Sequence, residues 1–129
     1  MIQSSGSVTL VLGGARSGKS RHAEAICREA GGALIYVATA EARDDEMKAR
    51  IAQHRSDRAA DGWRTIEEPR DLAGILEAEA PPGSVLLVDC LTLWLTNQLL
   101  GDADMDLEID RLCAAVSASA GDVVLVANE

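Results

Sequence analysis

The chain has 129 residues, 47% of them hydrophobic, and a formal net charge of -9 at pH 7. That length predicts a single domain with a buried core, and the acidic charge argues against a partner that is nucleic acid or an anionic membrane. No run of residues approaches the ~20 apolar positions of a membrane-spanning helix, and residues 1–7 are too short and polar for a signal peptide. We therefore expect a cytoplasmic protein.

Charge and residue usage differ along the chain. Every basic residue except Arg111 lies at or before Arg70, so an anionic ligand is expected to bind the N-terminal half. The absence of Phe leaves a core of Leu, Val, Ile and Ala, which suits a parallel sheet covered by helices. The cysteines are odd in number and form no CxxC pair, so we expect buried or free thiols at Cys27, Cys90 and Cys113.

Short apolar runs alternate with segments of helical periodicity along the whole chain, and Gly, Pro or Asp residues separate them. This alternation predicts an α/β fold with four strands in a mainly parallel sheet flanked by helices. The expected strands are 7–12, 33–39, 84–89 and 122–127, with a short extended segment at 64–69. The expected helices are 19–30, 44–58, 71–80, 91–100 and 107–120, the last preceded by a loop at 101–106.

The segment GGARSGKS, Gly13 to Ser20, matches the pattern GxxxxGK[ST]. Chance would produce such a match in roughly one of two hundred chains of this length. Its place between a strand and a helix favours a phosphate-binding P-loop over an ordinary Gly-rich turn. In a P-loop the backbone N–H groups and the helix N-terminus bind phosphate. Lys19 would then reach the β- and γ-phosphates, and the Ser20 hydroxyl would hold Mg²⁺.

Asp89 ends the strand at 84–89, the position of a Walker B acid. It could order Mg²⁺ or its water shell. The alternative is an aspartate that caps the following helix. Beside a P-loop, the metal role is favoured.

Arg50, His54 and Arg58 recur at intervals of four, so on a helix they share one face. Such a face could hold a phosphate chain. A neutral imidazole nitrogen can attack phosphorus, and neighbouring guanidinium groups stabilise developing negative charge. The spacing alone, however, slightly favours a solvated basic helix with a passive histidine.

Five segments, in chain order, resemble the bifunctional adenosylcobinamide kinase / adenosylcobinamide-phosphate guanylyltransferase family of cobalamin biosynthesis. They are TLVLGGARSGKSRHAEAI, YVATAEARDDEMKARIAQHRSDR, GWRTIEEP, LLVDCLTLWLTNQLL and VVLVANE. The resemblance implies a RecA-like P-loop domain that assembles into a homotrimer. It also implies Mg²⁺-dependent phosphorylation of adenosylcobinamide by ATP or GTP, followed by transfer of GMP from GTP to that phosphate through a guanylylated histidine.

On the matching positions, the resemblance implies that His54 receives GMP. Lys19 would stabilise the transferring phosphoryl group, and Ser20 and Asp89 would hold the metal. The nucleotide-binding residues would be Gly13, Gly14, Ala15, Arg16, Ser17, Gly18, Lys19, Ser20, Ala38, Thr39, Ala40, Arg55, Ser56, Asp57, Arg58, Glu67 and Asp89. The chain has QHR where HHK is common in the family, so one histidine stands there.

The family continues past the last of these segments with a turn, a basic helical region and a further strand. We therefore expect residues 1–129 to form a single P-loop domain without the family's C-terminal portion. Two other functions stay open on the residues alone. One is a small-molecule kinase in which His54 only binds the acceptor phosphate, and the other is a nucleotide-binding regulatory module.

Overall fold

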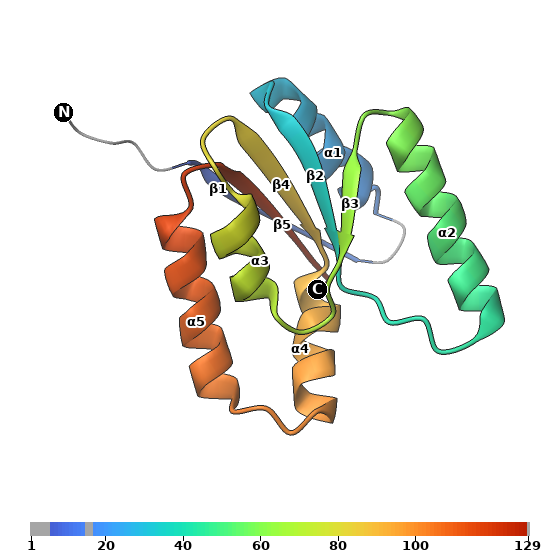
Figure 1. The fold of residues 1–129 in the computed structure, drawn as a ribbon, viewed down its shortest axis with the longest axis vertical. Coiled ribbons are helices and arrows are strands. Elements are labelled where there is room, and N and C mark those ends of the chain that lie inside the picture. The colour runs from blue at the N-terminus through green and yellow to red at the C-terminus, as the bar shows by residue number, and fades with distance from the viewer. Residues whose placement is uncertain (1–5, 15–16, 129) are drawn as a thin grey trace.

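The apolar runs form one parallel sheet of five strands, in the spatial order β1-β5-β4-β2-β3 (Figure 1). The computed structural model describes residues 6–14 and 17–128. The strands are β1 (Val8–Gly13), β2 (Ala33–Ala38), β3 (Arg64–Glu67), β4 (Ser84–Asp89) and β5 (Asp122–Asn128). The helices are α1 (Lys19–Ala30), α2 (Asp45–Ala60), α3 (Leu72–Glu79), α4 (Leu91–Leu100) and α5 (Met105–Ala118).

The predicted α/β class is confirmed, but the predicted count of four strands is one too low. The extended segment at 64–69 contains β3, which pairs with β2 at the edge of the sheet, Ile35 opposite Arg64 and Ala38 opposite Glu67. The helix expected to begin at residue 107 begins at Met105 instead. Asp104 accounts for this earlier start, because its side chain accepts a hydrogen bond from the Leu107 amide at 3.1 Å and caps the helix.

Both faces of the sheet are covered, because successive side chains of a strand point to opposite faces. Leu86 and Val88 of β4 pack with α3, α4 and α5 on one face, and Val85 and Leu87 pack toward α1 on the other. The edge strand β1 is covered less completely. Its side chains Val8, Leu10 and Leu12 are 49%, 53% and 57% exposed.

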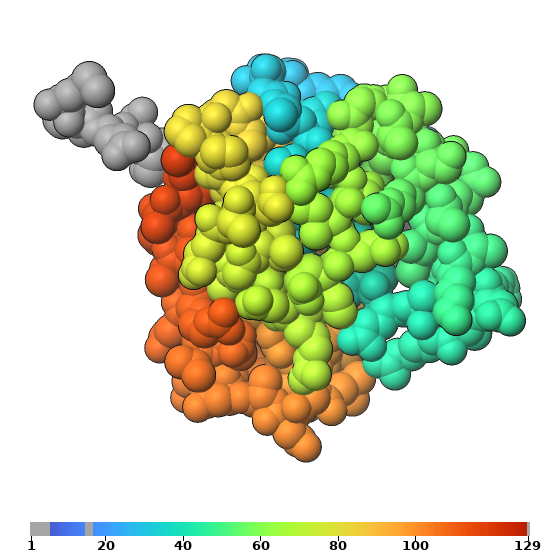
Figure 2. Space-filling view, viewed as in Figure 1, coloured from blue at the N-terminus to red at the C-terminus, as the bar shows by residue number. Residues whose placement is uncertain are grey.

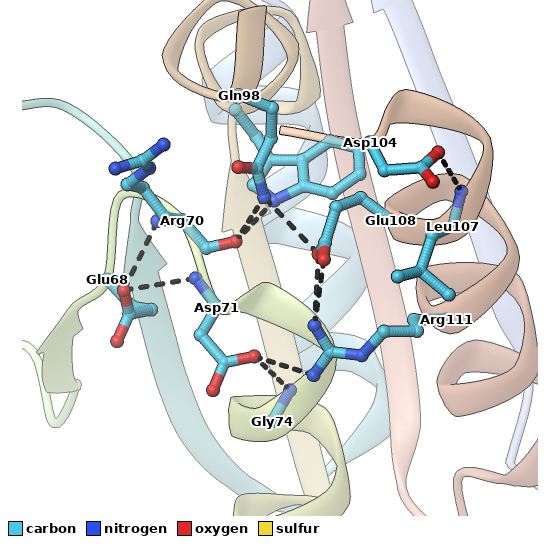
Figure 3. Close-up of polar contacts among 10 residues, drawn as sticks. Glu68, Arg70, Asp71, Gly74, Gln98, Asp104, Leu107, Glu108 and Arg111 are labelled. Atoms are coloured by element: carbon cyan, nitrogen blue, oxygen red, sulfur yellow. Dashed lines mark hydrogen bonds and ion pairs between the residues drawn. The ribbon is translucent and has the colours of Figure 1, made fainter. Parts of the chain in front are cut away.

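The connection between β3 and α3 is bound tightly to α4. The Trp94 indole and the Gln98 amide both donate to the Arg70 carbonyl, at 2.9 Å and 2.7 Å (Figure 3). The Asn97 amide donates to the Pro69 carbonyl at 3.0 Å and to the Thr39 carbonyl at 2.8 Å. These three α4 side chains are buried, so α4 fixes the ends of β2 and β3 together.

A second set of contacts joins α3 to α5. The Arg111 guanidinium bridges Asp71, at 3.0 Å, and Glu108, also at 3.0 Å (Figure 3). The Glu68 carboxylate accepts from the backbone amides of Arg70 and Asp71. The helices on this face are therefore tied to one another as well as to the sheet.

The three cysteines are free, as expected, with Cys27 and Cys90 buried and Cys113 exposed. Burial raises the pKa of the Cys27 thiol to about 11, so this thiol stays protonated at neutral pH. Among the described residues, no helix is both long enough and apolar enough to span a bilayer.

Candidate active site

The predicted P-loop lies between β1 and α1, and the part of it that the structure describes has the backbone of a tight loop. Gly18 has a φ of 81°, in the left-handed region that glycine adopts without strain. A Cβ at Gly13 would lie 2.5 Å from the Ser17 Oγ atom, so the loop closes against this glycine. Because Gly18 has no side chain to cap α1, the amides of the first helical turn remain available to an anion. Two predicted residues, Ala15 and Arg16, lie outside the described residues.

The side chains of Lys19 and Ser20, at the end of the loop, point differently. The Lys19 ammonium donates to the Gly14 carbonyl at 3.1 Å, which folds it back over the loop. Ser20 is exposed and lines a neighbouring cavity. Lys19 is thus placed beside the loop's own backbone, and Ser20 faces open space.

That cavity of about 450 Å³ is the feature that brings the predicted residues together. Ser20 of α1, Asp89 of β4 and His54 of α2 all line it, although they are far apart in sequence. The complete lining is Ser20, Glu24, Tyr36, Ala38, Ala40, Ile51, His54, Asp57, Arg58, Asp61, Asp89 and Leu93. The end of the P-loop and α2, the helix that carries His54, therefore face the same cavity.

Asp89 is held at the end of β4 by its neighbour in the sheet. The register of β2 and β4 places Ala38 opposite Asp89 and Tyr36 two residues earlier. The Tyr36 hydroxyl donates to the Asp89 Oδ2 atom at 2.5 Å. Burial, and then the Asp89 carboxylate, raise the pKa of Tyr36 far above its usual range, so the hydroxyl remains a donor.

Helix α2 contacts the cavity with the C-terminal half of its basic face. The Arg58 guanidinium carbon lies 3.8 Å from the centroid of the Tyr36 ring, and its Nε atom donates to Thr65 at 3.3 Å. His54, one turn earlier, is exposed and lines the cavity. Arg50 does not line it and instead pairs with Glu46 at 3.9 Å. The predicted three-residue face is therefore only partly at the site.

The other predicted residues of this region divide between two cavities. Asp57 lines the cavity with His54, whereas Arg55 and Glu67 form an ion pair at 3.3 Å and line a second cavity of about 360 Å³. Ala40 lines both. Ser56 is exposed and lines neither.

Thr39 does not present its side chain to either cavity. It is fully buried, and its hydroxyl donates to the Cys90 carbonyl at 2.8 Å and accepts from the Cys90 amide at 2.9 Å. Its backbone amide donates to the Asp89 carbonyl at 3.2 Å and its carbonyl accepts from Asn97 at 2.8 Å, so the polar groups of Thr39 are taken up by contacts within the protein. Its side chain ties the end of β2 to the end of β4.

The residues predicted to hold Mg²⁺ have suitable chemistry. Ser20 and Asp89 supply oxygen atoms, the ligands that Mg²⁺ prefers, and both line the same cavity. In the described part of the chain, no hydrogen bond occupies the second Asp89 oxygen, Oδ1. Among the same residues there is no cluster of three or more His, Cys, Asp or Glu side chains able to hold a metal.

Sequence reasoning missed Tyr36, which touches both Asp89 and Arg58. A signal was present: Tyr36 precedes the predicted residue Ala38 by two positions on a strand, so both side chains share one face. It also missed Trp63, whose ring lies edge-on to Tyr36 with centroids 5.9 Å apart. The sequence before this strand does not reveal that the indole is buried.

The sequence as a whole is similar to one family of known proteins. The family model described as cobinamide kinase / cobinamide phosphate guanyltransferase matches residues 9–129. The bifunctional adenosylcobalamin biosynthesis protein CobP of Pseudomonas aeruginosa is 54% identical over 122 residues, which cover 93% of this chain and 70% of that protein. The bifunctional adenosylcobalamin biosynthesis protein CobU of Escherichia coli is 43% identical over 135 aligned positions, covering 93% of this chain and 74% of that protein. The chain therefore belongs to the cobinamide kinase / cobinamide phosphate guanyltransferase family.

Proposed function

We propose that this chain phosphorylates adenosylcobinamide with ATP or GTP and then transfers GMP from GTP to the new phosphate, giving adenosylcobinamide-GDP. The supporting observation is the single cavity lined by Ser20, Asp89 and His54. A kinase needs the first two residues, and a covalent guanylyl transfer needs a nucleophile such as the third. Family membership supports both activities.

In the kinase step, the P-loop amides at the start of α1 bind the nucleotide phosphates. Lys19 leaves its contact with the Gly14 carbonyl and stabilises the transferring phosphoryl group. The substrate hydroxyl gives up its proton to solvent and forms a bond to the γ-phosphorus as the bond to the nucleoside diphosphate breaks. Ser20 and Asp89 would hold Mg²⁺, which neutralises phosphate charge when it is bound.

In the guanylyl step, an imidazole nitrogen of His54 attacks the α-phosphorus of GTP. A phosphorus–nitrogen bond forms, and the bond to the β-phosphate oxygen breaks to release pyrophosphate. Arg58, beside His54 on the cavity wall, supplies positive charge for the transition state. A phosphate oxygen of adenosylcobinamide phosphate then displaces the imidazole and takes the GMP group.

Intact mass measured after incubation with Mg²⁺ and GTP tests the covalent step. The protein should gain one GMP group that is labile to acid, and the His54→Ala variant should gain none while still phosphorylating adenosylcobinamide. A wild-type protein that phosphorylates the substrate but never carries GMP would favour the kinase in which His54 only binds the acceptor. A protein that binds nucleotide with no turnover of either kind would favour the regulatory module.

Three further properties of this chain remain proposals. The homotrimer that the resemblance implies is supported by the exposed leucines of α4, Leu93, Leu95, Leu99 and Leu100, which offer apolar surface to a second copy. Light scattering coupled to size-exclusion chromatography would measure the mass of the assembly. The single P-loop domain and the cytoplasmic location stay predictions of the sequence.

A further inference from the structure

Tyr36 lies where the two parts of the site meet. Its side chain is 9% exposed and lines the cavity with Asp89 and Arg58. It is the single tyrosine of the chain. Two different parts of this side chain make two different contacts, so their roles can be separated by substitution.

The hydroxyl contacts the residue at the kinase end of the cavity. It donates to Asp89 Oδ2 at 2.5 Å, and a hydrogen bond to a charged acceptor is among the stronger ones in proteins. Because this bond occupies one carboxylate oxygen, it fixes the rotation of the carboxylate and turns Oδ1 away from Tyr36. Asp89 itself is only partly buried and needs such a partner to hold one orientation.

The ring contacts the helix that carries the nucleophile. The Arg58 guanidinium stacks on it at 3.8 Å, and Trp63 supports the ring from the side with its plane at 87°. Helix α2 has no buried residue, so it lacks the apolar anchor that the other helices have. The Trp63 amide donates to the Arg58 carbonyl at 3.0 Å, which adds a backbone link at the same place. The contacts of Arg58 thus hold the C-terminal half of α2 against the sheet.

We propose that Tyr36 is a positioning residue that aligns the two halves of the site. Its hydroxyl orients Asp89 toward the P-loop, and its ring holds Arg58, and with it His54, over the same cavity. The inference rests on the proposed function, because it assigns Tyr36 to the alignment of the kinase and guanylyl steps. It predicts that removing the hydroxyl contact impairs the orientation of Asp89 alone, and that removing the ring contact impairs the placement of Arg58 and His54.

Tyr36→Phe tests the hydroxyl, because it keeps the ring. Binding of a non-hydrolysable ATP analogue is measured in Mg²⁺ and in EDTA. The variant should lose about tenfold in affinity in Mg²⁺ and stay within about twofold of wild type in EDTA. In the kinase assay, kcat should fall and the half-saturating Mg²⁺ concentration should rise, with no change in the KM for adenosylcobinamide. Wild-type binding of the Mg²⁺ complex by Tyr36→Phe would overturn the role of the hydroxyl.

Tyr36→Leu tests the ring, because it removes the stacking surface as well. The rate of GMP attachment to His54, followed by intact mass, should be roughly tenfold lower than in Tyr36→Phe. Arg58→Lys keeps the charge but loses the planar group, and it should slow attachment in the same way without changing the Mg²⁺ dependence of nucleotide binding. Equal attachment rates in Tyr36→Phe and Arg58→Lys would overturn the role of the ring, even if Tyr36→Leu does not fold.

Arg64→Gln is the matched control, since Arg64 of β3 pairs with Glu79 of α3 at 2.9 Å and does not line the cavity. It should match wild type in every measurement. If wild-type protein shows neither phosphorylation nor GMP attachment, the proposed function fails. The comparison of Tyr36→Phe with wild type in Mg²⁺ and EDTA still decides whether the hydroxyl orients Asp89.

Discussion

Helices α4 and α2 differ in how firmly they are attached to the sheet. Helix α4 buries Trp94, Asn97 and Gln98, each bonded to a backbone carbonyl of a strand connection. Helix α2 buries no residue and forms one flank of the molecule, coloured green in Figure 2. The main side-chain links of α2 to the sheet are the contacts of Arg58 and the exposed pair of Arg55 with Glu67.

The two regions therefore differ in how firmly they hold Asp89 and His54. Asp89, beside α4, ends a central strand whose other five residues are all buried. His54 lies on a helix whose contacts are individually weak, because exposed ion pairs and cation–π contacts each contribute about 1 kcal/mol or less. Asp89, proposed for the kinase step, is therefore built into the core, and His54, the proposed nucleophile, lies on a helix attached to that core.

The largest effect is expected from Asn97→Ala, which removes the donor to the Thr39 and Pro69 carbonyls. Leaving these buried acceptors unpaired should lower the free energy of unfolding by about 2–4 kcal/mol. Thr96→Ala on the exposed side of the same helix is the control and should change it by less than about 0.5 kcal/mol. Urea unfolding measures both, and equal values would remove the contrast between α4 and α2.

Native-state hydrogen exchange compares the two helices directly. Amides in the middle of α4 should exchange about 10²-fold or more slowly than those in the middle of α2, because α2 can open without unfolding the core. Mass spectrometry of peptic fragments measures the difference. Adding Mg²⁺ and GTP should slow exchange in α2 more than in α4. Similar protection of both helices in the free protein would show that α2 is anchored as firmly as α4.

Arg58→Ala should affect stability and activity to different extents. Loss of its stacking on Tyr36 and its bond to Thr65 should cost about 1 kcal/mol of unfolding free energy. GMP attachment to His54 should nevertheless slow by about tenfold or more. The matched control is Arg50→Ala on the same helix, where the arginine pairs with Glu46 and does not line the cavity. It should change neither quantity, and a loss of attachment in Arg50→Ala would show that the whole basic face acts.

Alkaline pH should loosen α1, which covers the same sheet face as Tyr36. Burial raises the pKa of Cys27 from the ordinary value of 9.0 to about 11 in the folded state. The folded protein therefore holds this proton more tightly than the unfolded chain. The contribution to stability is complete below pH 9 and is lost as the pH rises toward 11. Urea unfolding as a function of pH should show this decline, and Cys27→Ala should show a smaller one.

The smallest effect is expected from Arg55→Gln, which breaks the exposed ion pair with Glu67 at 3.3 Å. Both side chains are about half exposed, at 53% and 42%, so unfolding free energy should fall by only a few tenths of a kcal/mol. A change in the KM for GTP with no change in stability would support the predicted role of this pair in nucleotide binding. A stability loss above about 1 kcal/mol would instead make it a main anchor of α2.

Much of the fold could be predicted because its elements begin and end at chemically distinct residues. The predicted bounds of α1, β4 and α4 agree with the structure, since glycines, prolines and a strand-end aspartate separate apolar or helical runs. Strand β3 was harder to find, because it has four residues and carries a charged side chain at each end with no buried residue between them. An edge strand is completed by pairing with its neighbour, which a local pattern does not contain.

The site was predictable residue by residue but not as an arrangement. The P-loop pattern indicated Lys19 and Ser20, whereas the spacing of His54 and Arg58 slightly favoured a passive histidine and only the family resemblance assigned His54. The split between Arg50 and Arg58 depends on how α2 is rotated against the sheet, and four-residue spacing cannot show that rotation. Tyr36 depends on the β2–β4 register, which only the folded sheet defines.

The two tryptophans have a practical consequence, because each lies in one of the compared regions. Trp94 donates its N–H to the Arg70 carbonyl in the contacts around α4. Trp63 is 4% exposed beside Tyr36 and, within residues 6–14 and 17–128, it has the one buried side-chain nitrogen without a hydrogen-bond partner. An indole without a polar partner emits at shorter wavelength and is sensitive to nearby charge. The intrinsic fluorescence of Trp63 is thus expected to change when a charged ligand binds beside Tyr36, with no added label.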